Sequence, residues 1–300
     1  MSNYEVVATG LEFPEGPVAM SDGSVILVEI KRGTISRVDA ADGSIEVVAN
    51  PGGGPNGAAL GPDGALYVCN NGGFEWGQAR GLTVPGLVPQ DYSSGRIERI
   101  DIETGEVVTL YAEVNGEPLK GPNDLMFDRS GGFWFTDHGK TRARSRDRGG
   151  LYYAKADGSE IKEMAFPLDG PNGVGLSPDG DRVYVAETHQ GTILYWELSG
   201  EGELVSSPHG RFLARPAGRK LFDSLAMDAE GNVSVATIQT GGISTFTPNG
   251  DELEFFEVDD PICTNICFGG PKMRTAYITL SGTGQLIRTE WPRPGLPLPF

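Results

Sequence analysis

The sequence predicts an all-β fold, a six-bladed β-propeller with four antiparallel strands in each blade. Three observations lead to this prediction. One short phrase recurs six times, each copy is followed by a glycine-containing turn and an apolar run, and glycine makes up 44 of the 300 residues. An apolar strand, a tight turn and a second apolar strand form a β-hairpin. Repetition of such hairpins every 40–50 residues or so is typical of propeller blades.

The six copies of the phrase divide the chain into units. Three copies share the letters Gly-Pro-Asn and lie at 54–60, 121–127 and 170–176, and three looser copies lie at 13–18, 221–226 and 262–267. The equivalent positions in the six copies are occupied by Glu15, Asn56, Asn123, Asn172, Asp223 and Thr264. Their successive spacings are 41, 67, 49, 51 and 41 residues, which fits blades of four strands.

Each phrase supplies the first strand of a blade, and the turn after it leads into the second strand. The sequence predicts second strands over 25–28, 66–68, 133–135, 183–185, 233–235 and 276–278. It predicts third strands over 33–38, 95–100, 149–154, 191–196 and 242–246. Apolar or alternating runs bounded by Gly, Asp and Asn are typical of such strands.

The N-terminal residues and the longest unit complete the predicted architecture. Residues 4–8 read as a strand that joins the sixth unit, so that the propeller closes and leaves no open sheet edge there. The 67-residue spacing indicates an insertion over 72–94, between two strands of the second blade. We expect residues 1–300 to form one domain without a linker.

The composition limits the classes of partner. The chain has 24 Lys and Arg against 41 Asp and Glu, a formal net charge of −17. We therefore expect it to bind neither nucleic acid nor an anionic membrane surface. No run of residues is long and apolar enough for a membrane span, and we expect no secretory signal. Three cysteines without further metal ligands indicate free thiols, so we expect a cytoplasmic location. We also expect a monomer or homodimer whose partner is a small molecule.

The six equivalent residues form a candidate metal site. The first strand of each propeller blade lines the central channel, so these residues should meet at one mouth of that channel. Five of the six are carboxylates or carboxamides, and none is a cysteine or histidine. Oxygen donors of this kind suit Ca²⁺, Mg²⁺ or Mn²⁺ better than a structural zinc. A turn at strand entry explains any one asparagine, but five oxygen donors at equivalent positions favour a cation site.

Five stretches carry a resemblance to a known family. They are 13–17 (Phe-Pro-Glu-Gly-Pro), 121–124 (Gly-Pro-Asn-Asp), 132–137 (Gly-Phe-Trp-Phe-Thr-Asp), 170–173 (Gly-Pro-Asn-Gly) and 223–232. In type and order they resemble the SMP-30/gluconolactonase/LRE-like family over nearly the whole chain. The resemblance implies a six-bladed propeller with one divalent cation in its channel. Members of that family include sugar-acid lactonases, drug-responsive bacterial lactonases and relatives that hydrolyse organophosphates.

The resemblance also assigns ligands. The family's metal-binding Glu, Asn and Asp fall on Glu15, Asn172 and Asp223, and a further Asn that touches metal or substrate falls on Asn123. It implies Ca²⁺ first, with Mg²⁺, Mn²⁺ or Zn²⁺ as alternatives, and no organic cofactor. Sugar-lactone members carry an arginine two residues before the asparagine that falls on Asn123. This chain has Gly121 there, so a guanidinium clamp for a polyhydroxylated substrate is missing.

These residues fit a hydrolase that opens a lactone, either a sugar-acid lactone or a partly hydrophobic one. A cation with three protein ligands keeps open positions, one of which a carbonyl oxygen could take. Asp223 is the candidate base for an attacking water or the candidate nucleophile, and the sequence leaves both roles open. Asn123 and His138 are the other candidate catalytic residues, since histidine carries protons near neutral pH.

The ends of the second strands and the insertion supply the candidate substrate-binding residues. We expect the following side chains at the mouth: Asn56, Asn71, Phe74, Trp76, Asp124, His138, His189 and Gln239. Aromatic residues in the insertion suggest a substrate lid with an apolar wall, and packing onto a blade explains them equally well. Lys140 and the arginines at 142, 144, 146 and 148 are expected to be solvated loop charges.

Three other functions are open at this stage. An arylesterase or phosphotriesterase would use the same cation and carboxylates. A non-catalytic propeller would bind a protein partner and use Ca²⁺ only to lock its channel. A metal-free enzyme resembling strictosidine synthase would use a glutamate for acid–base chemistry, which the oxygen-rich set of equivalent residues disfavours.

Overall fold

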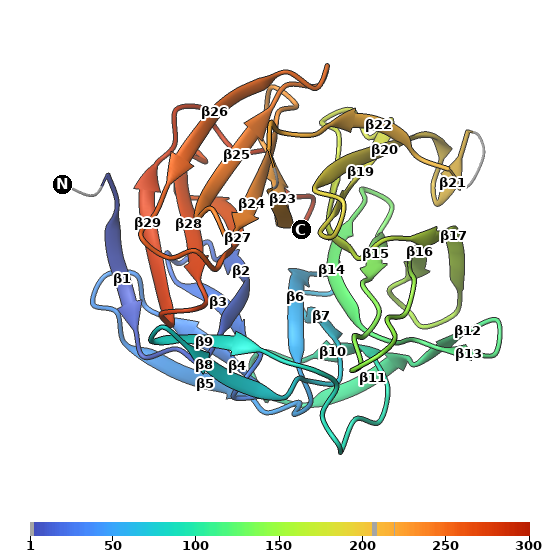
Figure 1. The fold of residues 1–300 in the computed structure, drawn as a ribbon, viewed down its shortest axis with the longest axis horizontal. Coiled ribbons are helices and arrows are strands. Elements are labelled where there is room, and N and C mark those ends of the chain that lie inside the picture. The colour runs from blue at the N-terminus through green and yellow to red at the C-terminus, as the bar shows by residue number, and fades with distance from the viewer. Residues whose placement is uncertain (1–2, 206–208, 219) are drawn as a thin grey trace.

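The protein is a β-propeller of six blades arranged around a central axis (Figure 1), as predicted. The computed structural model describes residues 3–205, 209–218 and 220–300, and every regular element in these ranges is a β-strand. Each blade is an antiparallel sheet whose innermost strand faces the axis. Within these ranges, no helix is long and apolar enough to cross a membrane.

The first three blades follow one another along the chain. The first consists of β2 (Pro14–Ala19), β3 (Val25–Glu29), β4 (Thr34–Val38) and β5 (Ile45–Ala49). The second consists of β6 (Pro55–Leu60), β7 (Leu66–Asn70), β10 (Arg96–Ile100) and β11 (Val107–Tyr111). The third consists of β14 (Pro122–Phe127), β15 (Gly132–Asp137), β16 (Gly149–Lys155) and β17 (Ile161–Leu168).

The predicted insertion is confirmed. It leaves the second blade after β7 and forms a hairpin of β8 (Trp76–Ala79) and β9 (Leu82–Pro85) before β10. A second small hairpin, β12 (Glu113–Val114) with β13 (Glu117–Pro118), connects the second and third blades.

The fourth blade has more strands than predicted. It consists of β18 (Pro171–Leu176), β19 (Arg182–Glu187), β20 (Thr192–Gly200) and β22 (Arg211–Ala214), and the short β21 (Glu203–Leu204) also pairs with β20. This extra pairing is possible because β20 is long enough for β21 and β22 to pair with different parts of it. The fifth blade consists of β23 (Leu221–Met227), β24 (Val233–Ile238), β25 (Gly242–Phe246) and β26 (Glu252–Glu257).

The sixth blade closes the ring with both ends of the chain. It consists of β27 (Cys263–Gly269), β28 (Thr275–Leu280), β29 (Gln285–Glu290) and the N-terminal β1 (Glu5–Thr9). In the register of β1 with β29, Glu5 lies opposite Arg288 and the two side chains form an ion pair. The predicted closure is confirmed, and it removes the edge that β29 would otherwise expose.

The core lies between neighbouring blades. Between the second and third blades, for example, the Tyr67 ring lies 5.0 Å from Phe127 and 5.8 Å from Phe133. Both phenylalanines belong to a buried cluster drawn from those two blades. Apolar packing of this kind is the main force that holds one sheet against the next.

Each innermost strand departs from regular pairing near its beginning. The register slips between Glu15 and Val18, Pro55 and Ala58, Pro122 and Leu125, Pro171 and Val174, Phe222 and Leu225, and Cys263 and Asn265. A β-bulge bends a strand and re-aims its side chains. All six equivalent residues therefore lie at the same kind of irregularity.

Two glycines next to these residues are required for close approach of neighbouring blades. A Cβ atom on Gly57 would lie 2.5 Å from the Asn123 carbonyl oxygen, and one on Gly173 would lie 2.6 Å from the Leu225 nitrogen. Both contacts are with backbone atoms of the next blade's innermost strand. The Asn-Gly pairs at these two positions therefore serve packing around the channel.

Replacing Gly57 by alanine should destabilise the propeller, because the added methyl group meets backbone that cannot move away. We expect the free energy of unfolding to fall by about 1–3 kcal/mol. Gly200→Ala is the matched control, since no atom lies within 4 Å of a Cβ placed there. Chemical unfolding followed by circular dichroism compares the two variants, and equal midpoints would contradict the close-approach explanation.

Candidate functional site

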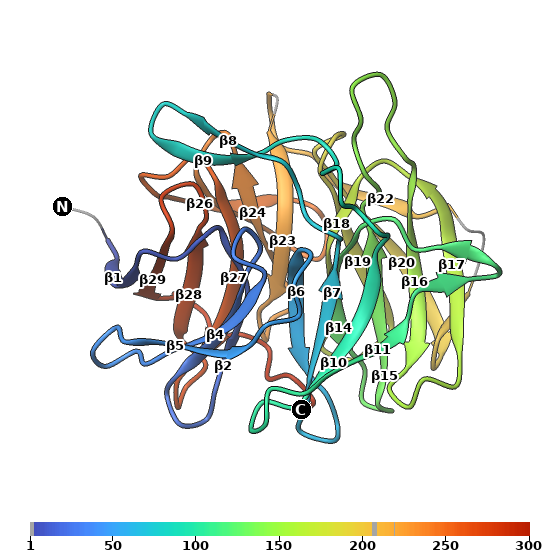
Figure 2. The same ribbon diagram turned by 90° about the horizontal axis from the view of Figure 1, so that it is seen from below.

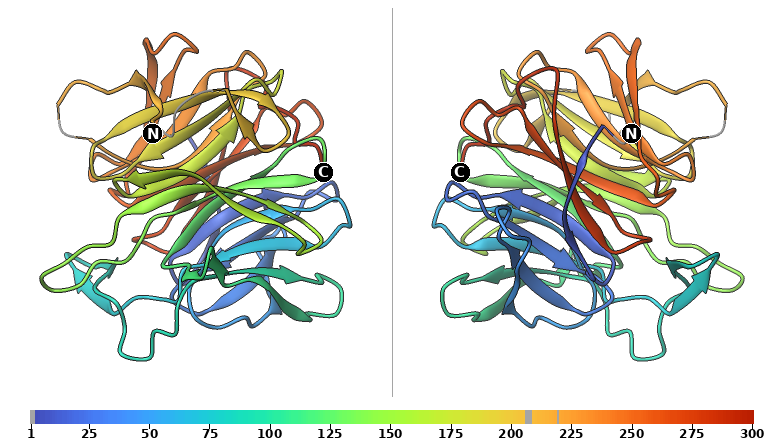
Figure 3. Two further views of the ribbon diagram at one scale, coloured as in Figure 1. Left: turned by 90° about the vertical axis from the view of Figure 1, so that its right-hand side faces the viewer. Right: turned by 90° about the vertical axis from the view of Figure 1, so that its left-hand side faces the viewer.

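The six equivalent residues lie at one end of the central channel. Here they are called the ring, and the end at which they lie is called the mouth. They stand at or beside the first residues of β2, β6, β14, β18, β23 and β27, the strands that neighbour one another around the axis. Five are buried and Asp223 is half-buried. The β8–β9 hairpin lies at the mouth, and the C-terminus lies at the opposite face (Figures 2 and 3).

A side chain at the end of the second strand anchors the start of the innermost strand in four blades. The backbone N–H of Glu12 donates to Glu29, that of Gly54 to Asn70, that of Gly121 to Asp137 and that of Asp169 to Glu187, at 2.7–2.9 Å. All four accepting side chains are buried. They hold the chain two or three residues before a ring member. These four side chains therefore brace the backbone at the mouth.

Glu15 is a buried carboxylate held in one orientation. Its Oε2 accepts hydrogen bonds from Asn265 Nδ2 at 2.6 Å and from the Gly16 backbone N–H at 2.7 Å. Burial raises the pKa of Glu15 to about 7, against the effect of these hydrogen bonds. Loss of hydration disfavours the charged form of a carboxyl group.

Two further carboxylates lie close enough to Glu15 for its negative charge to raise their pKa values. Burial, followed by repulsion from Glu15, raises the pKa of Asp124 well above its usual range. The pKa of Asp223 is raised well above its usual range by the same two causes, and Asp124 adds to the repulsion. Three buried acidic groups, two of which are destabilised as anions by the charge of Glu15, form a site that favours positive charge.

The amide groups of the ring leave oxygen atoms available. Asn123 Oδ1 is buried and has no hydrogen-bond partner. Asn172 donates through Nδ2 to Thr188 Oγ1 at 3.3 Å, and its Oδ1 receives only a long 3.4 Å contact from Ser224 Oγ. Buried polar atoms are usually paired, so both oxygens are suited to a ligand that the protein itself does not supply.

The donor set therefore fits the divalent cation that the resemblance implies. Carboxylate and amide oxygens are the ligands of hard cations such as Ca²⁺, and a cation would relieve the repulsion among the three carboxylates. Within the described ranges, no three His, Cys, Asp or Glu side chains are grouped so that they could hold an ion by themselves. The amide oxygens of Asn123 and Asn172 would have to complete the ligand set.

Two histidines lie together beside the ring. The rings of His138 and His189 have centroids 5.1 Å apart at 65°, and both lie against Gly170, two residues before Asn172. Burial and repulsion from His189 lower the pKa of His138 to about 4. Burial also lowers the pKa of His189. Both imidazoles are therefore neutral near pH 7, and His189 Nε2 is buried without a partner.

The insertion lies across several blades at the mouth. We call residues 72–94 the strap. The Thr83 N–H donates to Gly282 O of the sixth blade at 2.9 Å, and the Val88 N–H donates to Thr141 O of the third at 3.3 Å. The half-buried Trp76 packs on Phe13, just before the first blade, with ring centroids 5.0 Å apart. Of the two predicted roles of these aromatic residues, packing onto a blade is thus shown for Trp76.

The other residues predicted at the mouth differ in how far they are buried. Asn56 and Asn71 are buried, and Asn71 Nδ2 has no hydrogen-bond partner. Phe74 contacts Trp76 with ring centroids 5.9 Å apart. Gln239 is exposed on the turn between β24 and β25 and has a positive φ of 71°.

The expectation for Lys140 was wrong. Its side chain is buried at 1% exposure and lies among residues of the strap and the end of β7. Its position in a loop suggested a solvated charge. The burial could not be foreseen from the sequence, because the partners come from a segment about 50–70 residues away in the chain. The neighbouring arginines at 142, 146 and 148 do pair with nearby acids, Asp147 and Asp169.

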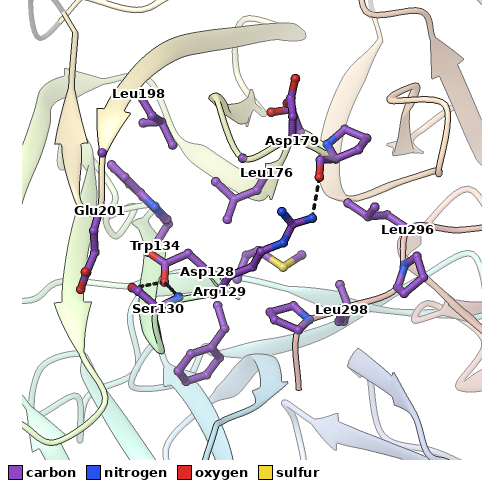
Figure 4. Close-up of a pocket in the computed structure, with 18 residues that line it drawn as sticks. Asp128, Arg129, Ser130, Trp134, Leu176, Asp179, Leu198, Glu201, Leu296 and Leu298 are labelled. Atoms are coloured by element: carbon purple, nitrogen blue, oxygen red, sulfur yellow. Dashed lines mark hydrogen bonds between the residues drawn. The ribbon is translucent and has the colours of Figure 1, made fainter.

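Two cavities open toward the opposite face. The larger, about 900 Å³, is mostly apolar and extends from the C-terminal residues 296–298 and Phe300 to Gly16, Asp124 and Asn265 below the ring. The smaller, about 330 Å³, lies between the third and fourth blades, where Arg129 donates to the Pro178 carbonyl oxygen (Figure 4). Neither is lined by a ring residue or by the two histidines.

Known proteins share both the sequence pattern and the fold. The chain is 26% identical to a gluconolactonase of Zymomonas mobilis, in an alignment that covers 95% of this chain and 81% of that protein. It is 27% identical to the lactonase drp35 of Staphylococcus saprophyticus, covering 83% of this chain and 70% of that one.

Solved structures show the same propeller. A gluconolactonase from Xanthomonas campestris superposes with a TM-score of 0.75 and 22% identity, covering 96% of this chain and 89% of the other. The calcium-binding protein regucalcin from Agrobacterium tumefaciens superposes with a TM-score of 0.75 and 18% identity, covering 99% and 98%. The sequence model of the SMP-30/Gluconolactonase/LRE-like region matches residues 13–282, a range that contains all six ring residues. The chain belongs to the SMP-30/gluconolactonase/LRE-like family.

Proposed function

We propose that this protein is a divalent-cation-dependent hydrolase that opens a lactone. The observation that carries the proposal is the set of buried polar atoms without partners. In the described part of the chain these are Asn71 Nδ2, Asn123 Oδ1, His189 Nε2 and two tryptophan nitrogens. Three of the five belong to residues predicted at the mouth. The named activities of the gluconolactonase and drp35 relatives support the choice of a lactone as substrate.

Glu15, Asn123, Asn172 and Asp223 would hold the cation, and Ca²⁺ is the ion that their oxygen atoms suit best. A bound cation supplies positive charge that stabilises the negative charge developing on a carbonyl oxygen. Asp124 is a third acidic group in the same region, and its carboxylate form would strengthen the attraction for the ion.

Asp223 is the residue that would handle the proton of the attacking water. It is half-buried, whereas the other ring residues are buried, which makes it the most exposed member of the ring. In this role its carboxylate accepts a proton as the water oxygen bonds to the carbonyl carbon. The ester bond then breaks, and the leaving oxygen takes up a proton to give a hydroxy acid. Direct attack by the same carboxylate is the alternative.

The neutral histidine pair and the strap would bind the substrate. An uncharged imidazole both donates and accepts a hydrogen bond, so His138 and His189 suit the ring oxygen or a hydroxyl group of a lactone. Asn56, Asn71, Phe74, Trp76 and Gln239 would complete the mouth. A cytoplasmic location is part of this proposal.

Removal of the cation should abolish turnover. We expect protein treated with EDTA to hydrolyse none of a panel of lactones and aryl esters, and one added metal among Ca²⁺, Mg²⁺, Mn²⁺ and Zn²⁺ to restore the activity.

Asp223→Asn should fold and lose about 100-fold or more in kcat, whereas the exposed Asp251→Asn should match wild type. Lack of turnover in folded, metal-loaded protein would instead favour a non-catalytic propeller. A preference for aryl or phosphate esters would replace lactones as the substrate.

The low pKa of His138 should be visible in the pH dependence of stability. Its pKa is about 4 in the folded protein and about 6.5 when unfolded, so the unfolded chain binds the proton first as the pH falls. The stability that the neutral imidazole contributes is present above pH 6.5 and is lost toward pH 4. Between pH 8 and pH 5 we expect wild type to lose about 1–2 kcal/mol more than His138→Gln. Parallel urea titrations of the two proteins test this, and equal losses would show that His138 is not shielded.

A further inference from the structure

Lys140 is a buried cation whose close partners all come from one segment. Its Nζ donates to Gly73 O at 2.6 Å and to Asn71 Oδ1 at 3.2 Å. The same atom lies 3.9 Å from the centroid of the Phe74 ring and 5.5 Å from that of Tyr92. Every one of these contacts is with the strap or with the residue directly before it.

No carboxylate pairs with this ammonium group among the described residues. Burial lowers the pKa of Lys140 to about 7, with Arg142 adding to the effect and Asp137 and Asp147 opposing it. Burying a cation with so little compensation is costly. In this position Lys140 holds the strap, because the Gly73 carbonyl group and two aromatic rings of the strap, together with the Asn71 amide directly before it, converge on the ammonium group.

The segment that Lys140 holds carries the aromatic residues of the mouth. Phe74 contacts both Lys140 and Trp76, and Trp76 in turn packs on Phe13, two residues before the ring member Glu15. The strap therefore joins the third blade, through Lys140, to the first blade beside the ring. Tyr92 holds the end of the strap in place, because its hydroxyl donates to Lys120 O at 2.5 Å.

We propose that Lys140 is a positioning residue that fixes the strap as an aromatic wall of the mouth, and that this wall selects lactones with a flat or apolar substituent over polyhydroxylated ones. The proposal of selectivity rests on the proposed function. A flat, apolar substituent gains contact with Phe74 and Trp76, whereas a hydroxyl group placed there would lose its hydration without finding a partner.

Lys140→Met tests both parts, because methionine keeps the length of the stem and removes the charge and the donors. Trp76 reports on the strap directly: the other three tryptophans, at 134, 196 and 291, are at most 3% exposed. We expect Lys140→Met to raise acrylamide quenching of tryptophan fluorescence, and the increase to vanish in a Trp76→Phe background. Lys162→Met, on the outer strand β17, removes one positive charge at an exposed site and should behave as wild type.

The same variant should change substrate preference. For dihydrocoumarin against glucono-δ-lactone, we expect the ratio of kcat/KM values to fall about tenfold, mainly through KM of the aromatic substrate. Lys140→Arg, which keeps the charge, should recover part of the ratio. Trp76→Leu should lower it without disturbing Lys140, and serves if Lys140→Met does not fold.

The outcomes separate the parts of the proposal. Unchanged quenching in folded Lys140→Met would overturn the positioning role, whatever the activity. Increased quenching with an unchanged ratio would overturn the selectivity while leaving the proposed lactonase function intact. Absence of any lactone turnover in wild type would overturn the proposed function and the selectivity with it, and the quenching result would still decide the role of Lys140.

Discussion

The structure at the mouth depends on how the chain enters each innermost strand. In four blades a buried side chain at the end of the second strand accepts a backbone N–H from the segment just before the ring residue. The strand then bulges at the ring residue itself. In three of these blades the acceptor is a buried carboxylate, and a hydrogen bond to a carboxylate is stronger than one between neutral groups, so it helps to hold the bulge in place. The register slip itself recurs in all six blades and places six side chains around one axis, although none of them is adjacent to another in the sequence.

Charge concentrated on that axis gives the site its chemistry. Glu15 is close enough to Asp124 and Asp223 to raise the pKa of each, and the amide oxygens of the ring residues Asn123 and Asn172 have little or no hydrogen bonding. A folded protein tolerates such a grouping only where another interaction offsets its cost. The nearby histidines are neutral and so do not compete with a cation for this region.

The strap adds what the repeated blades cannot supply. A symmetric ring of hairpins leaves a mouth that is alike on all sides, whereas residues 72–94 contact the sixth, first and third blades and cover one side of it. The histidine pair lies beside the start of the fourth blade. The mouth is therefore apolar and aromatic on one side and polar on the other, which is the kind of asymmetry that orients a small substrate.

The six blades, the closure by the N-terminal strand, the insertion and the ring positions could all be predicted from the sequence alone, because each follows from a repeated pattern of apolar runs, turns and polar residues. The sequence also indicated that Asn71, His138 and His189 belong near the mouth. The environment of single side chains, in contrast, is visible only in the folded protein. The burial of Lys140, the repulsion of Asp124 and Asp223 by Glu15, and the bracing role of Glu29 and Glu187 all depend on which groups surround them. Such contacts join residues far apart in the chain, so a pattern along the sequence does not reveal them.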